Sequence, residues 1–151
     1  MVEIFGRQWE QEELRKYVGS MEQLAGIEYA RLCGGPKEDV AVMLVRSGSG
    51  LSYQVVPGRG LDIGLAEYQG FPLAWRSPSG YVHASFFDPL GRGWLRGFAG
   101  GLLTTCGLTY AGGPTVDGRE ELGLHGRASY TPADSVQWDT YWKQEIGRAH
   151  V

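Results

Sequence analysis

The sequence predicts an all-β protein built from antiparallel strands, with one short helix near the N-terminus. Three observations point to this class. Glycine accounts for 24 of the 151 residues, more than twice its usual share of roughly 7%. Apolar and polar residues alternate with a period of two in segments 61–66 and 71–75, as in half-buried strands. Glycine and proline recur between these segments at strand-and-turn spacing, which favours hairpins over βαβ units.

The N-terminal helix is expected over residues 9–18. Leu14, Tyr17 and Val18 share one face at i, i+3 and i+4. Acidic residues come early in this segment and basic residues late, as the helix dipole prefers. Gly19 is a natural helix end. Residues 21–25 can add one more helical turn or form a loop.

Strands are expected from residue 26 onward. Residues 26–32 are a short candidate. Residues 40–45 form a continuous apolar run between a charged segment and a Ser/Gly turn, which predicts a strand buried on both faces. Residues 51–56 are expected to pair back on it as a hairpin.

The segment 91–126 has a different character because it is rich in glycine and its loops are long. Residues 102–108 are its only clear strand candidate. Long ordered loops in a compact domain are often functional.

Composition excludes several classes of protein. With 17 acidic and 14 basic residues the formal net charge is −3, so nothing draws the chain to nucleic acid in general. No apolar run approaches the roughly 18 residues of a membrane helix, and the acidic N-terminus does not resemble a signal peptide. Cys33 and Cys106 form neither a disulfide framework nor a zinc pattern. We expect reduced thiols and a cytoplasmic protein.

Motifs for common cofactors are missing from the sequence. It has no P-loop, no Gly-x-Gly-x-x-Gly after a strand and no Gly-x-Ser-x-Gly elbow. The histidines are too few and too isolated for a metal site. No cofactor and no metal are therefore expected.

His125 and Arg127 form the first candidate site. They lie in the glycine-flanked segment 123–127, and glycines allow close approach of the backbone to a ligand. In a strand their spacing aims both side chains at one face, where they could bind sugar hydroxyls. The alternative is a histidine held by backbone groups in a turn. His83 is more consistent with a structural role or a contact at the rim of a site.

Arg59 and Asp62 form the second candidate site. Asp62 lies in an otherwise apolar strand, and a buried carboxylate needs a cation or several hydrogen-bond donors. Pairing with Arg59 to hold a hairpin is the favoured interpretation, and direct ligand contact is the alternative.

The segment 94–103 supplies the third candidate site. Trp94 and Phe98 could form a stacking wall for the apolar C–H face of a sugar ring, and Arg96 could reach an oxyanion. Core packing of the two aromatic residues is an equally good interpretation.

Taken together, several motifs resemble one known family. They are the segments 57–63 (PGRGLDI), 72–75 (PLAW), 93–95 (GWL), 100–108 (GGLLTTCGL) and 123–127 (GLHGR). They resemble the aldose 1-epimerase-like proteins of a largely uncharacterised bacterial family in the galactose-mutarotase-like superfamily. The resemblance runs from about residue 18 to residue 133. Ala84 and Tyr130 depart from the usual proline and asparagine.

The resemblance implies a β-supersandwich, in which two large antiparallel sheets pack face to face around a sugar site on a concave face. Family members are longer, so residues 1–145 are expected to be the N-terminal half of such a domain. Residues 146–151 can be encoded by ATC-GGA-AGA-GCA-CAC-GTC, a string found in a common sequencing adapter, and are expected to be an artefact. A chance match is the alternative.

The resemblance also implies a function. His125 matches the sugar-contacting histidine of the superfamily and Arg127 the arginine that often follows it. Arg59, Asp62, Arg96 and Trp94 complete the expected substrate-binding set. Mutarotation needs a base and an acid. The superfamily uses a glutamate and a second histidine, which are expected in the missing half.

We therefore expect a sugar-binding fragment of an isomerase that is itself inactive. The alternatives are a non-catalytic carbohydrate-binding or sensing domain and another sugar-converting activity on the same fold. The expected ligand is a small sugar, whose identity, phosphorylation and acidity stay open, as does the oligomeric state.

Overall fold

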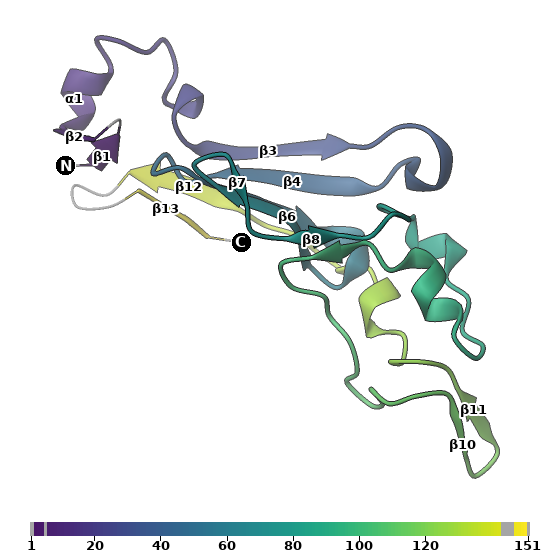
Figure 1. Ribbon diagram of the computed structural model, residues 1–151. Helices are drawn as coiled ribbons and strands as arrows, with labels where there is room; N and C mark the ends of the chain where they lie inside the picture. Colours follow the sequence, from purple (N-terminus) through teal and green to yellow (C-terminus); the bar gives the residue numbers. More distant parts are fainter. Residues whose placement is uncertain (1, 5, 143–146, 151) are drawn as a thin grey trace.

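A five-stranded antiparallel sheet forms the centre of the computed structural model, which describes residues 2–4, 6–142 and 147–150. Its strand order is β3-β4-β5-β6-β7, so each strand pairs with its neighbour in sequence (Figure 1). The strands are β3 (Gly26–Arg31), β4 (Ala41–Arg46), β5 (Leu51–Val56), β6 (Asp62–Tyr68) and β7 (Phe71–Pro72). All four pairings are antiparallel, which confirms the predicted class.

Short hairpins and single helical turns surround this sheet. The additional strand pairs are β1 (Val2–Ile4) with β2 (Arg7–Trp9), β8 (Trp75–Arg76) with β9 (Gly100–Gly101), β10 (Thr115–Asp117) with β11 (Glu120–Leu122), and β12 (Asp139–Trp142) with β13 (Gly147–His150). The 3-10 turns are η1 (Met21–Gln23), η2 (Gly35–Lys37), η3 (Pro57–Arg59), η4 (Ala84–Phe86), η5 (Gly93–Gly97) and η6 (Ala128–Tyr130). In Figure 1 the β10–β11 hairpin protrudes at the end of the molecule away from the N-terminus.

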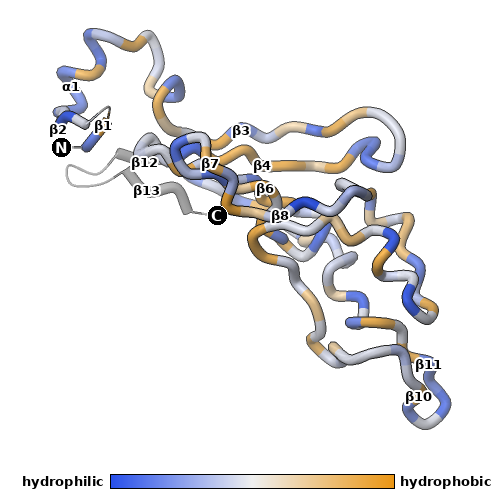
Figure 2. The backbone as a smooth tube through the Cα atoms, viewed as in Figure 1, coloured by the Kyte–Doolittle hydropathy of each residue, from blue (hydrophilic) through white to orange (hydrophobic). Residues whose placement is uncertain are grey.

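Strand β4 is the centre of the core, and its apolar course is visible in Figure 2. Val42 packs on one face of the sheet with Val56 and Tyr81. Met43 and Val45 pack on the other face. A strand buried on both faces is what the apolar run predicted.

The N-terminal helix is shorter than expected. Only Gln11–Leu14 are α-helical (α1), and Leu14 is the one buried residue of the helix. Tyr17 meets the Trp9 ring edge-on but is 72% exposed, so Leu14 is the only residue of the apolar stripe that is buried. Short helices depend on such packing. The following turn, η1, is held by a capping box between Ser20 and Gln23.

Strand β6 has the predicted period of two, but its small and polar residues face inward. Gly64 and Ala66 are buried beside Asp62, whereas Leu65 is exposed. Tyr81 lies across Gly64 so closely that a Cβ at this position would overlap the tyrosine hydroxyl. The side that receives Tyr81 therefore has no room for leucine.

The strand predicted at residues 102–108 is wrong. Leu103 makes a single bridge to Ile63, and the backbone N–H of Thr105 donates to the Asp62 carboxylate. Gly107 and Leu108 then turn with positive φ angles of 82° and 79°. A backbone whose donors bind a side chain cannot continue a strand ladder.

The segment 71–75 divides into β7 and β8 and does not form one strand. Residues 147–150 of the proposed adapter tail pair with β12, whereas residues 146 and 151 lie outside the described residues. The adapter origin stays a prediction.

None of the helices in the described part of the chain has the length and apolarity to cross a membrane.

Candidate functional site

Arg59 and Asp62 are brought together by the tight connection between β5 and β6. Turn η3 ends at Gly60, which adopts the left-handed conformation with φ 61°. Asp62 then begins β6. Arg59 Nε lies 3.5 Å from Asp62 Oδ2, and the two residues are 2% and 4% exposed. The predicted buried pair that holds this hairpin is confirmed.

Asp62 also fixes a distant loop. Its Oδ1 accepts the backbone N–H of Thr105 at 2.6 Å. Burial raises the pKa of Asp62 above its ordinary value, although the Thr105 bonds and the Arg59 charge oppose the shift. The carboxylate is therefore a structural tie between β6 and the segment around Thr105.

Tyr130 packs against Arg59 and connects it to Trp94. The Arg59 guanidinium carbon lies 4.2 Å from the centre of the Tyr130 ring, a cation–π contact. Phe87 stacks on the same tyrosine with ring centres 4.4 Å apart. The Tyr130 hydroxyl donates to the Trp94 carbonyl at 2.7 Å, and burial raises the pKa of this phenol.

Trp94 links Tyr130 to His125. Its indole Nε1 donates to Ser129 Oγ at 2.7 Å, and the indole meets the His125 imidazole edge-on with ring centres 4.9 Å apart. Phe98 stacks on the indole at 5.0 Å. Trp94 is only 5% exposed, so it supports His125 from within. The expected stacking wall would need this ring to be uncovered.

His125 lies in a turn with a φ of 57°, which is the alternative that its motif left open, so the shared face that a strand would have given His125 and Arg127 does not form. Its backbone N–H donates to the Gly112 carbonyl, and its own carbonyl accepts from Gly107. The imidazole Nδ1 lies 2.9 Å from the Ala111 carbonyl oxygen. Because a carbonyl only accepts, Nδ1 carries the proton and Nε2 presents a lone pair.

The arginines near this cluster differ in their surroundings. Arg127 is exposed, and its side chain has no hydrogen bond or ion pair among the described residues. Arg96 extends into solvent and pairs with Asp88 at 2.5 Å. The structure therefore joins His125, Trp94, Arg59 and Asp62 through Tyr130, and it leaves Arg96 and the Arg127 side chain outside that cluster.

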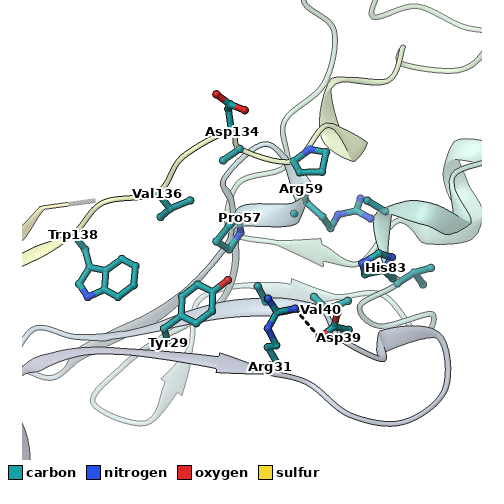
Figure 3. A pocket seen from close by; sticks show the side chains of 16 residues that line it. Tyr29, Arg31, Asp39, Val40, Pro57, Arg59, His83, Asp134, Val136 and Trp138 are labelled. Carbon is teal, nitrogen blue, oxygen red and sulfur yellow. Dashed lines mark hydrogen bonds and ion pairs between the residues drawn. The ribbon is translucent and has the colours of Figure 1, made fainter.

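A cavity of about 440 Å³ is lined in part by the three residues of η3, Pro57–Arg59 (Figure 3). Tyr29 and Trp138 stack on one another at its edge, with ring centres 5.6 Å apart. Its lining includes Arg31, Asp39, Pro57, Arg59, His83, Asp134 and Val136, but neither His125 nor Arg127.

Sequence reasoning missed the aromatic pair. Tyr29 and Trp138 are more than a hundred positions apart, and neither lies in a motif. His83, expected at most at a rim, lines the cavity. Its Nδ1 accepts from the Ser85 N–H, so Nε2 carries the proton. In the described part of the chain no three metal-ligating side chains converge.

The fold and these motifs define a class of protein, the galactose-mutarotase-like β-sandwiches. The model of one family, described as "Domain of unknown function (DUF4432)", matches residues 37–151. The chain belongs to this family.

One solved structure extends the comparison. It is a protein from Klebsiella pneumoniae subsp. pneumoniae that carries the provisional name aldose 1-epimerase, with 30% sequence identity and a TM-score of 0.72. The match covers 80% of this chain and 34% of that protein, so this chain spans about a third of its length. No curated protein matches. The predicted family resemblance and fold class are confirmed.

Proposed function

We propose that this chain carries the first part of a saccharide site in an aldose 1-epimerase-like protein. One observation supports this most directly. His125 and Asp62, far apart in sequence, belong to one continuous cluster through Trp94, Tyr130 and Arg59. Buried polar and aromatic clusters of this kind hold a few side chains rigidly, as binding sites require. The name of the Klebsiella protein agrees with a sugar as ligand.

His125 is the proposed sugar contact. The Ala111 carbonyl fixes its tautomer and Trp94 fixes the plane of its ring. Nε2 can then accept a hydrogen bond from a sugar hydroxyl. Arg127 follows two residues later, and we propose its exposed guanidinium, which has no partner among the described residues, as a second donor to the sugar.

We further propose that these residues bind a sugar without converting it. The carboxylate of the cluster, Asp62, is buried and already held by Arg59 and Thr105. It is not free to take a proton from an anomeric hydroxyl. The base and the acid of a mutarotase would come from residues that this sequence does not include. This agrees with a chain that spans about a third of its solved relative.

A non-catalytic carbohydrate-binding role is the second candidate, because the cluster alone supports binding.

A cytoplasmic location is part of the same proposal. It is supported by Cys33 and Cys106, which are both exposed and unpaired.

Binding is tested by titrating the chain with a panel of neutral and acidic monosaccharides, followed by NMR chemical shifts. We expect His125→Ala and Arg127→Ala each to weaken binding about tenfold, or roughly 1.4 kcal/mol. Arg119→Ala, which removes an exposed arginine on the β10–β11 turn, is the matched control and should bind like the original chain.

Catalysis is tested separately by polarimetry. The chain should not accelerate the interconversion of anomers, whereas a longer version with the missing acid and base should do so. Equal activity of the two would contradict the proposed division. If no sugar binds at any accessible concentration, the saccharide site itself is disproved.

A further inference from the structure

We propose that Ser129 is a positioning residue for the candidate sugar contact, and that it acts on His125 through the Trp94 indole. This inference rests on the proposed saccharide function and deepens it, because it names a residue that controls the geometry of the same site. Ser129 is 0% exposed, so its side chain does not itself touch a ligand.

Ser129 binds the polar edge of the Trp94 indole. Nε1 donates to Ser129 Oγ at 2.7 Å, and both residues are buried. A buried N–H group without an acceptor is costly. Turning the indole over about its bond to Cβ would carry Nε1 away from Ser129 Oγ and break this hydrogen bond. The bond therefore selects one direction in which the indole points.

The other contacts of Trp94 leave this direction open. Phe98 stacks on the indole with ring centres 5.0 Å apart and planes at 25°, and stacked rings can still slide or turn over within the stack. The Tyr130 hydroxyl donates to the Trp94 backbone carbonyl at 2.7 Å, which places the main chain and not the ring. Ser129 is thus the contact that orients the indole.

The indole in turn limits how the His125 ring can lie. The two rings meet edge-on, with centres 4.9 Å apart and planes at 84°. Nδ1 of the imidazole lies 2.9 Å from the Ala111 carbonyl oxygen, and one hydrogen bond at one corner allows the ring to rock. The packed indole opposes that motion. Nε2 therefore keeps a fixed direction, as a pre-organised ligand contact requires.

Ser129 and His125 reach Trp94 from one short stretch of chain. His125 lies in the turn before η6, and Ser129 is the central residue of η6, four positions later. This stretch contacts the indole at two places, through the imidazole ring and through the Ser129 hydroxyl. A displacement of the indole from Ser129 must therefore change its contact with His125.

The first test needs no sugar. Ser129→Ala removes the acceptor, and the imidazole C–H signals of His125 should shift in the NMR spectrum, because the ring current of the indole depends steeply on distance and angle. Loss of signals in His125→Ala identifies them, and the His83 signals should stay in place. Ser52→Ala is the matched control, since it removes a hydroxyl on β5 that donates to Glu67 at 3.0 Å. It should leave the His125 signals unchanged.

The second test measures binding by titrating the full chain with the panel of monosaccharides. Ser129→Ala should bind about fivefold more weakly than the original chain, which corresponds to the loss of one hydrogen bond. Added to His125→Ala, it should cause no further loss, because its effect passes through His125. Ser129→Cys keeps a side chain of similar size with a weaker acceptor, and should give an intermediate affinity.

Three results would overturn the inference while the saccharide proposal stands. They are unshifted His125 signals in Ser129→Ala, an unchanged affinity of that variant, and a further loss of affinity in the double variant. If no sugar binds the original chain, the proposed function fails, and the His125 signals alone decide whether Ser129 positions the imidazole. Should Ser129→Ala not fold, as judged by circular dichroism, Ser129→Cys makes the same comparisons.

Discussion

At the scale of single residues, Asp62 is the one on which the structure of the candidate site depends most. It closes the β5–β6 turn through Arg59 and ties the segment around Thr105 to β6. Burial nevertheless raises the pKa of its carboxyl, so the folded state holds the proton more tightly than the unfolded chain does. The stability that this carboxyl contributes to the folded state is therefore fully present below pH 3.8, the ordinary pKa of an aspartate. It is lost as the pH rises through the raised pKa of Asp62.

Replacing Asp62 with asparagine should therefore remove one pH dependence. Asp62→Asn keeps an oxygen for the Thr105 N–H and carries no charge at any pH, so the loss of stability that accompanies ionisation of Asp62 is removed. The decline of stability just above pH 3.8 should become shallower. Urea unfolding at several pH values measures this. Asp117→Asn, on an exposed strand, should keep the original slope, and an unchanged slope in Asp62→Asn would refute the assignment.

At the scale of elements, β4 and β6 differ in how well the pattern of apolar residues predicts which side chains are buried. Met43 in β4 is fully buried, whereas Leu65 in β6 is 37% exposed. We expect Met43→Ala to lower the free energy of unfolding by about 2–5 kcal/mol. Leu65→Ala should cost below about 1 kcal/mol. Denaturant melts of the two variants check the difference, and equal losses would contradict the observed orientation of β6.

The sequence predicted those features that are decided locally. The apolar run of β4, the β4–β5 hairpin and the Arg59–Asp62 pair depend on neighbours within a few residues. The inward face of β6 depends instead on Tyr81, and the irregular course of residues 102–108 depends on the Asp62 carboxylate. These features are determined by contacts between segments that are far apart in the sequence. The period of the apolar residues contains no information about such contacts.

The site shows the same division. The motif around His125 allowed either a strand or a turn, and the turn forms because two neighbouring loops bind its backbone. The stack of Tyr29 on Trp138 and the hydrogen bond from Trp94 to Ser129 become visible only after the chain has folded.

At the scale of the whole molecule, much apolar surface is uncovered. The accessible surface is 9863 Å² for a chain of 16.6 kDa, and a compact monomer of this mass would expose about 7,600 Å². Several large side chains on neighbouring segments contribute to the excess, among them Leu65, Leu73, Trp75, Leu102 and Leu103. Large exposed apolar patches usually mark a surface that binds a protein, a membrane or a ligand, or that causes aggregation.

We expect the isolated chain to associate or to remain partly molten. Sedimentation velocity over a range of concentrations should show oligomers, and a dye that binds apolar surface should fluoresce. Leu103→Lys should reduce the association more than Tyr17→Lys, which alters an exposed residue of the N-terminal segment. A soluble monomer with a sharp, cooperative melt would contradict the expectation.

The protruding β10–β11 hairpin has a practical consequence. Its turn is exposed, and β11 ends at Leu122, three positions before His125. A fluorescent label attached at this tip would lie close in the sequence to His125 without replacing any residue of the proposed site. A change in its fluorescence on titration with a sugar would report binding near the imidazole.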